Sequence, residues 1–183
     1  MTPEISNDIL AALRRSEVIA YPTEAVWGLG CDPDSTQALE RIMALKQRDP
    51  AKGVILVAAD ITQFAPWLDG LEASLYTRLE ASWPGPVTWL VPDNGRAHPL
   101  VRGEHAAVAL RVSAHPLVQA LCHRFGGPIV STSANKAGQM PCLCSDEVRS
   151  VFGDSVTVVE GSLGGRTRPS DIFDLVSGHA LRA

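Results

Sequence analysis

Three of the chain's sixteen lysines and arginines crowd into the seven residues from Lys46 to Lys52. Lys46, Arg48 and Lys52 follow a helix that is predicted to begin at Asp34 or Ser35, and they precede an apolar run typical of a buried strand. Cations at the end of a helix can serve simply to complement the helix dipole. Cations in a connection to a buried strand are more typical of a site for phosphate or carboxylate. The stretch therefore indicates an anion site, with helix-end cations as the alternative.

A second stretch gathers hydroxyl and amide side chains behind a short apolar strand. Ser131, Thr132 and Ser133 stand in a row, and Asn135 and Lys136 follow closely. These groups donate hydrogen bonds, and the backbone N–H groups of such a loop can form an anion-binding concavity. The alternative is a polar turn with a helix cap, which needs only one or two such residues. The stretch also fits the Ser-x-x-Lys pattern of serine acyltransferases, but their companion motifs are missing, so we set that chemistry aside.

Three further features place polar groups near predicted strands. Residues 21–30 offer Thr23 and Glu24 in a Gly-containing loop that lacks the dinucleotide fingerprint, and the chain contains no Walker-type phosphate loop. A structural strand-to-helix turn is the alternative for this loop.

Arg111 lies among apolar residues of a predicted strand, so it needs a partner, and an internal ion pair is the alternative to a ligand. The Gly-rich, basic loop 161–170 either closes over a ligand or is a mobile surface loop.

The elements that would position these groups alternate irregularly between helix and strand. Apolar periodicity predicts helices after Ser6, from Asp34 or Ser35 to Lys46, and over 60–67, 71–82, 116–126 and 146–152. Runs of β-prone residues predict strands over 18–21, 54–57, 87–91, 107–112, 129–130, 156–160 and 172–176. We expect one α/β (α+β-like) domain over residues 1–183, with a twisted mixed parallel/antiparallel sheet flanked by helices. Ligands of such sheets bind at strand ends, which predicts a cleft for phosphate or carboxylate.

The composition narrows the class of protein. The chain has 183 residues, of which 45% are hydrophobic and 20% charged, as is usual for a globular protein. Its net charge of −4 argues against a protein that coats nucleic acid. We recognise no secretory signal and no membrane span, so we expect a cytoplasmic protein with reduced cysteines and no membrane partner. Cys142 and Cys144 lack zinc-site spacing, so no protein-bound metal is expected. The five scattered histidines are expected at the surface or as helix caps.

Six short motifs follow one another along the chain. They are Tyr21-Pro22-Thr23-Glu24 with Gly28-Leu29-Gly30, Lys46-x-Arg48, Trp83-Pro84-Gly85-Pro86-Val87-Thr88, Leu110-Arg111-Val112, Ser131-Thr132-Ser133-Ala134-Asn135, and Pro169-Ser170. In this order and at this spacing they resemble the YrdC-like family over roughly residues 9–176. The chain stops after that domain, so it resembles the short bacterial TsaC type, without the extra C-terminal domain of longer relatives.

The resemblance implies a nucleotidyltransferase that makes threonylcarbamoyl-adenylate from L-threonine, bicarbonate and ATP and releases pyrophosphate. Mg²⁺ would accompany ATP, and no tightly bound metal is implied. The product would pass to a tRNA threonylcarbamoyl-transfer complex, which modifies the adenosine beside the anticodon of certain tRNAs. The implied fold is a twisted mixed sheet with a deep, positively charged cleft.

The resemblance also implies roles for individual residues. Lys46 and Arg48 would be catalytic and face the ATP phosphates or the carboxylate of the intermediate, with Lys52 as a looser match. The rest of the ATP site would be Ser131, Ser133 and Asn135, and the threonine site would be Thr23, Arg111, Thr132 and Ser170. The chain departs from the usual family pattern at Ala25, Ser113 and Asp171, and Asp171 would bring a negative charge near an anion site.

Three other functions remain open at this stage. The first is an RNA-binding factor without catalysis, although weak RNA binding is also compatible with an enzyme. The second is a carbamoyl-handling enzyme with another acceptor, since related domains occur in hydrogenase-maturation proteins. The third is a module that binds ATP or threonine and releases no pyrophosphate.

Overall fold

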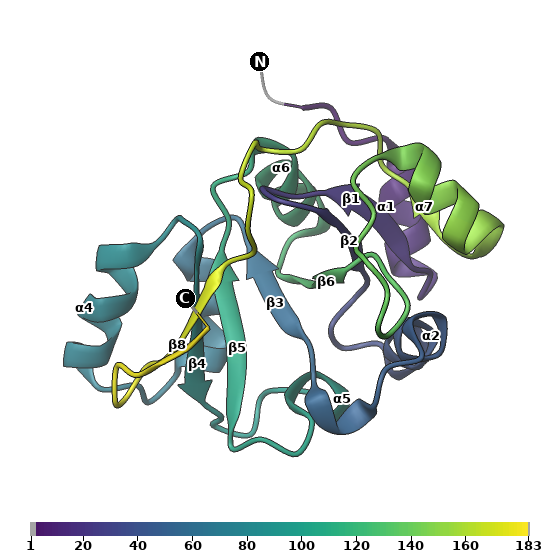
Figure 1. Cartoon of the computed structure of the whole chain (residues 1–183). Coiled ribbons are helices and arrows are strands. Elements are labelled where there is room, and N and C mark those ends of the chain that lie inside the picture. Colours follow the sequence, from purple (N-terminus) through teal and green to yellow (C-terminus); the bar gives the residue numbers. More distant parts are fainter. Residues whose placement is uncertain (1–2, 183) are drawn as a thin grey trace.

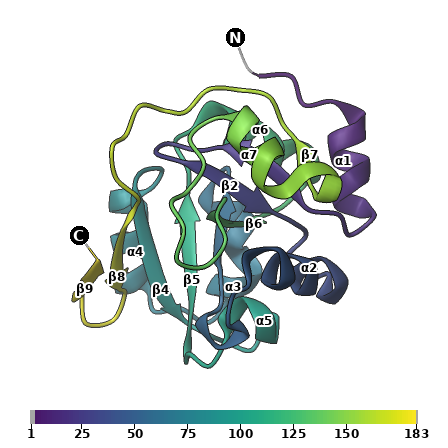
Figure 2. The same ribbon diagram turned by 45° about the vertical axis from the view of Figure 1, so that its right-hand side comes forward.

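The structure is a computed structural model that describes residues 3–182. A mixed sheet forms the centre of the molecule. Within this range the sheet has nine strands in the order β7-β1-β2-β6-β3-β5-β4-β8-β9 (Figures 1 and 2). The strands are β1 (Ile19–Pro22), β2 (Trp27–Gly30), β3 (Ile55–Ala58), β4 (Val87–Pro92), β5 (Ala107–Val112), β6 (Ile129–Ser133), β7 (Thr157–Val158), β8 (Asp171–Asp174) and β9 (Ala180–Arg182). Three neighbouring pairs are parallel, namely β1 with β7, β3 with β5, and β4 with β8. The other neighbours are antiparallel, which confirms the predicted mixed sheet.

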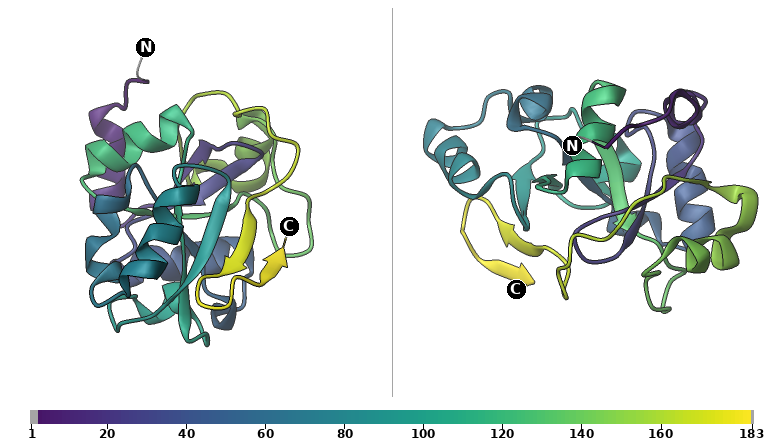
Figure 3. Two further views of the ribbon diagram at one scale, coloured as in Figure 1. Left: turned by 90° about the vertical axis from the view of Figure 1, so that its left-hand side faces the viewer. Right: turned by 90° about the horizontal axis from the view of Figure 1, so that it is seen from above.

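Helices cover both faces of this sheet. They are α1 (Asn7–Arg14), α2 (Thr36–Lys46), α3 (Ala65–Leu68), α4 (Ala73–Ser82), α5 (Pro99–Arg102), α6 (Pro116–Phe125) and α7 (Ser145–Phe152), with 3-10 turns at Pro50–Lys52, Ile61–Phe64 and Gly153–Ser155. Helices α4 and α7 lie at opposite ends of the molecule, whereas α1 and α6 lie side by side (Figures 1 and 3). No helix in the described range is long and apolar enough to cross a bilayer.

Local signals in the sequence explain where several helices begin. Ser35 caps α2, because its hydroxyl accepts a hydrogen bond of 3.1 Å from the Ala38 N–H. His98 and His115 cap α5 and α6 through Nδ1, and in both cases a proline occupies the next position. The expectation that histidines serve at the surface or as caps is confirmed for these two.

The two faces of the sheet have different covers. On β5, Val108, Leu110 and Val112 face the larger hydrophobic core, to which α2, α3 and α4 contribute. The opposite face is partly covered by α1 and α6, which pack on β1 and β3 and form a second core. Ala107 and Ala109, which alternate with the core residues of β5, line a cavity on this second face. The part of the face beyond α6 is therefore where a ligand can enter.

The segment after β1 differs both from the predicted Gly-containing loop and from its alternative, a strand-to-helix turn. The chain reverses there and returns as β2, which pairs antiparallel with β1 and then with β6. Two glycines in β2 weaken its strand signal, because glycine is unfavourable in strands unless another backbone approaches closely. Such an approach occurs at Gly30, where a Cβ atom would lie 2.6 Å from the Tyr21 ring and 2.6 Å from the Val130 carbonyl oxygen. The Tyr21 hydroxyl donates a hydrogen bond of 3.0 Å to that same oxygen.

We predict that Gly30→Ala destabilises the protein by about 1–3 kcal/mol, because a methyl group would be forced into a closed contact. Thermal unfolding followed by circular dichroism measures the loss. Gly127→Ala is the matched control, since a Cβ atom at Gly127 would meet nothing within 4 Å. Equal unfolding temperatures for the two variants would contradict the close approach at Gly30.

Candidate active site

A cavity of about 480 Å³ opens on the part of the second sheet face that α6 leaves uncovered. Its floor includes Ile55 of β3, Ala109 of β5 and Ser131 of β6, which are register partners across the three strands. The segment between β7 and β8, drawn in yellow-green, runs over the molecule and borders the cavity (Figure 2). The small side chains of Ala107 and Ala109 leave the room that a ligand would occupy.

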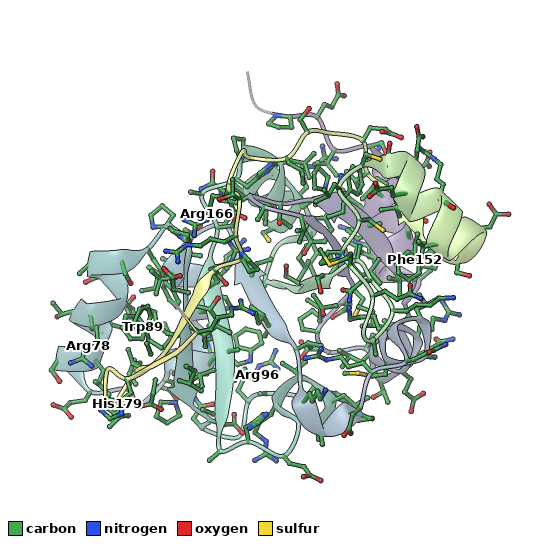
Figure 4. The ribbon with its side chains drawn as sticks, in the orientation of Figure 1. Arg78, Trp89, Arg96, Phe152, Arg166 and His179 are labelled. Carbon is green, nitrogen blue, oxygen red and sulfur yellow. The ribbon has the colours of Figure 1, made fainter. Side chains whose placement is uncertain are left out.

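Ionisable side chains in the cavity wall are strongly biased toward cations. Seven of the lining residues are lysine or arginine, namely Arg48, Lys52, Arg102, Arg111, Arg166, Arg168 and Arg182. Glu24 is the only carboxylate among the lining residues of the described range, and His105 is the only histidine. Figure 4 shows Arg166 on the yellow segment that leads down into β8. The chain's net charge of −4 gives no indication of this local excess.

Lys46 lies behind the cavity rather than in its wall. It is the last residue of α2, and only 3% of its surface is exposed. Its ammonium group donates hydrogen bonds to the Ser133 carbonyl, to the Asn135 carbonyl at 3.0 Å and to Asn135 Oδ1 at 3.3 Å. These acceptors use all three of its hydrogens. Burial, and next the charge of Arg48, lower the pKa of Lys46 to about 8.

Arg48 and Lys52 reach the cavity from the connection between α2 and β3. The helix ends at Gln47, whose φ of 51° places it in the left-handed region and turns the chain out of the helical path. Arg48 donates from Nε to the Gly53 carbonyl at 3.0 Å, which fixes the guanidinium plane. The Asp49 side chain caps the following 3-10 turn, at the end of which Lys52 stands. Lys46 therefore lies at the helix end, where a cation complements the helix dipole, whereas Arg48 and Lys52 lie outside the helix.

The polar run after the start of β6 divides between the cavity and a turn. Ser131, Thr132 and Ser133 line the cavity, and the strand extends through Ser133, beyond the predicted end. Asn135 is not in the cavity wall. Its side-chain amide donates to the carbonyls of Lys136 and Gln139 at 3.0 and 2.9 Å, and its Oδ1 accepts from Ser133 Oγ. The run is thus divided between three hydroxyl residues in the cavity wall and a polar turn that contains Asn135.

Arg111 has the internal ion pair that its apolar surroundings require, and it also lines the cavity. Its Nη1 lies 2.7 Å from Glu24 Oε1, and the two side chains are 8% and 13% exposed. The Ser113 hydroxyl donates to the same oxygen at 2.7 Å. Burial raises the pKa of Glu24, but the Arg111 charge and the two hydrogen bonds outweigh it, so the pKa lies below its usual value. The departure from the family pattern at Ser113 therefore supplies a hydroxyl to this cluster.

The remaining predicted residues, Thr23 and Ser170, lie in the cavity wall as well. Thr23 Oγ1 donates to the Val26 carbonyl at 2.7 Å within the β1–β2 turn. Ser170 shares a hydrogen bond of 2.8 Å with Thr88, and Arg182 donates to the Ser170 carbonyl at 2.8 Å. The neighbouring Asp171 is not among the lining residues, and its carboxylate faces Arg168 at 3.7 Å. Its negative charge is thus directed to a cation.

The sequence did not indicate Arg102, His105 or Arg182 as cavity residues. Each lies outside any motif, and only the folding of α5, the connection to β5, and β9 against the sheet brings them to the wall. Arg166 and Arg168 belong to the basic loop 161–170, which carried a signal. That loop is tied to the β1–β2 turn, because the N–H groups of Gly164 and Arg166 donate to the Thr23 and Glu24 carbonyls at 3.0 and 2.9 Å.

Comparisons with known proteins agree with this fold. A family model for Sua5, YciO and YrdC proteins, which carries the description telomere recombination, matches residues 11–183. A threonylcarbamoyl-AMP synthase from Chromohalobacter salexigens is 63% identical over 96% of this chain and 95% of its own length. A protein of the same name from Serratia proteamaculans is 51% identical over 97% of this chain and 95% of its own length.

Solved structures share the fold at lower identity. The crystal structure of P. abyssi Sua5 complexed with L-threonine superposes with a TM-score of 0.84 and 24% identity, over 91% of this chain and 49% of that protein. Because the family model spans almost all of the sequence and the two relatives are more than half identical along it, this chain belongs to the Sua5/YciO/YrdC family.

Proposed function

We infer that this chain is a threonylcarbamoyl-AMP synthase, an enzyme that joins L-threonine, bicarbonate and ATP and releases pyrophosphate. The observation that carries this inference is the cavity, whose wall combines arginines, one lysine and strand-end hydroxyls at positions where the family motifs lie. The 63% identity to a protein of that name over 96% of the chain supports the same activity. The proposal includes a cytoplasmic location, where ATP and tRNA are both present.

The chemistry requires control of negative charge more than it requires a nucleophile from the enzyme. The threonine nitrogen combines with bicarbonate to give a carbamate, with loss of water and a proton. A carbamate oxygen then attacks the α-phosphorus of ATP, and pyrophosphate leaves. Charge that accumulates on phosphate oxygens is stabilised by donors that are already oriented, as the Arg48 guanidinium is by its bond to Gly53. We therefore assign positioning and charge stabilisation to the protein.

The proposed subsites follow the wall of the cavity. Arg48, Lys52, Ser131 and Ser133 would contact ATP, and Thr23, Arg111, Thr132 and Ser170 would hold threonine. Lys46 and Asn135 would act from behind the wall, because Lys46 fixes the carbonyls of Ser133 and Asn135. The cavity as a whole would be positively charged.

Mg²⁺ would enter as part of the ATP substrate. Residues 3–182 bring together no group of three side chains of the kinds that hold a metal ion, and the ionisable side chains of the cavity wall are mostly cations. The ATP phosphates would therefore provide most of the ligands of the ion. The product would pass to a tRNA threonylcarbamoyl-transfer complex, and any direct RNA contact would be weak.

We predict that the protein, supplied with MgATP and bicarbonate, releases pyrophosphate only when L-threonine is present. A coupled pyrophosphate assay with each amino acid in turn measures this selectivity. ATP binding without threonine-dependent pyrophosphate would contradict the proposal and indicate a binding module. Turnover with carbamoyl phosphate in place of threonine and bicarbonate would indicate a carbamoyl-handling enzyme with another acceptor.

We also predict different consequences for two neighbouring cations. Arg48→Ala should lower kcat/KM by about 10²- to 10³-fold with little loss of stability, because it removes a donor that faces the transferred phosphate. Lys46→Ala should lower activity and also destabilise the fold by about 1–3 kcal/mol, because it removes the buried ammonium group that donates to the carbonyls of Ser133 and Asn135. Activity assays and thermal unfolding of both variants separate the two effects.

Lys136→Ala is the matched control for this pair, since Lys136 follows the same polar run but is not in the cavity wall. It should retain both activity and stability. Turnover like that of the wild type in the Arg48 and Lys46 variants would contradict the proposed ATP site.

A further inference from the structure

One oxygen of the Glu24 carboxylate has no hydrogen-bonding partner among the described residues. Glu24 Oε2 is buried, whereas Oε1 accepts from Arg111 Nη1 and from Ser113 Oγ, both at 2.7 Å. A buried carboxylate oxygen without a donor costs free energy, so its persistence requires either compensation or a ligand. Because Glu24 lines the cavity, a ligand that enters there and displaces the atoms covering Oε2 can supply the missing donor.

The carboxylate is held firmly in this orientation. Ser113 Oγ accepts a hydrogen bond of 3.1 Å from the His115 N–H, which directs the hydroxyl hydrogen toward Glu24. The backbone of Glu24 is held as well, because its carbonyl accepts from the Arg166 N–H at 2.9 Å. Arg111 and Ser113 keep the pKa of Glu24 below its usual value despite burial, so the group is an anion at neutral pH. An anion of low pKa is a poor proton acceptor and a good partner for a cation.

The surroundings restrict which cation this can be. Glu24 stands alone as a carboxylate in a wall that contains seven lysines and arginines, and no group of three metal-ligating side chains occurs in residues 3–182. A free amino acid carries both charges, with its carboxylate and its ammonium group on the same carbon atom. Such a molecule matches a site in which one anion stands among several cations. Thr23 and Ser170, which are proposed to contact threonine, line the same cavity.

We propose that Glu24 Oε2 is the acceptor for the α-ammonium group of the amino-acid substrate, and that it selects amino acids over carboxylates that lack this group. The inference rests on the proposed function. Glu24 would orient the nitrogen that later forms the carbamate bond, while Arg111, held by the other oxygen of Glu24, remains available to the substrate carboxylate. Glu24 does not take the proton that this nitrogen must lose, and a different group accepts it.

Isothermal titration calorimetry without ATP or Mg²⁺ tests the proposal with two ligands, L-threonine and (R)-3-hydroxybutyrate. The second is threonine with hydrogen in place of the ammonium group. The wild-type protein should bind threonine more tightly. Glu24→Gln should weaken threonine binding by about 10- to 100-fold, as loss of a hydrogen bond between charged groups does. It should leave hydroxybutyrate binding unchanged or tighter, because the wall becomes more positive.

Asp171→Asn is the matched control, since it removes a carboxylate beside the cavity that is not part of the wall. It should keep the wild-type preference for threonine. Equal weakening of both ligands in Glu24→Gln would overturn the proposal, because Glu24 would then act only by holding Arg111. Unchanged threonine binding would also overturn it, as expected if Oε2 serves the Mg²⁺ that arrives with ATP.

The preference of the wild-type protein is informative even if Glu24→Gln fails to fold. Equal affinity for threonine and hydroxybutyrate would exclude an ammonium site. Pyrophosphate release by the wild-type protein is measured in parallel. If threonine-dependent release is present and any one of these three contrary binding results is found, only the role of Glu24 is overturned. If release is absent, the proposed function fails and the role of Glu24 fails with it.

Discussion

The ion pair between Glu24 and Arg111 connects two parts of the sheet that are not neighbours. Glu24 lies in the turn between β1 and β2, and Arg111 lies on β5, with β6 and β3 between them in the strand order. Both residues line the cavity, so the pair spans the intervening strands within the cavity wall. Removing two charges from water is costly, and the contact of 2.7 Å and the added Ser113 hydroxyl offset that cost. The loop 161–170 is held to this same turn by backbone hydrogen bonds.

A second buried charge organises the other side of the site. Lys46 joins the end of α2 to the turn after β6, and the Ala137 N–H donates back to the Lys46 carbonyl at 2.7 Å. A short helix, a strand end and a turn are thereby held in a single arrangement. Arg48 and Ser133, which lie on either side of this junction, face the cavity in fixed positions. Polar groups inside the protein thus determine the geometry of polar groups in the wall.

Local features of the sequence were sufficient for most of the fold. Helix α2 and strand β5 follow directly from capping and periodicity. Each of the six motifs contributes at least one residue to the cavity wall. Strand β2 was not predicted, because Gly28 and Gly30 obscure it. The close approach that requires Gly30 involves the Val130 carbonyl, which lies far along the sequence, as well as the Tyr21 ring. The burial of Lys46 was likewise invisible, since its acceptors come from residues almost ninety positions later. Arg182 offered no signal, because β9 is short and exposed.

Strand β5 serves the hydrophobic core and the cavity with alternate residues. Val108, Leu110 and Val112 pack into the core, whereas Ala107, Ala109 and Arg111 line the cavity. Insertion or deletion of a single residue here would exchange the two sets, placing an arginine in the core and a leucine in the binding site. Over evolutionary time this strand can change its side chains one by one, but it can change its length only in steps of two. An even spacing between Ala107 and Arg111 is therefore what keeps both residues on the cavity side of the strand.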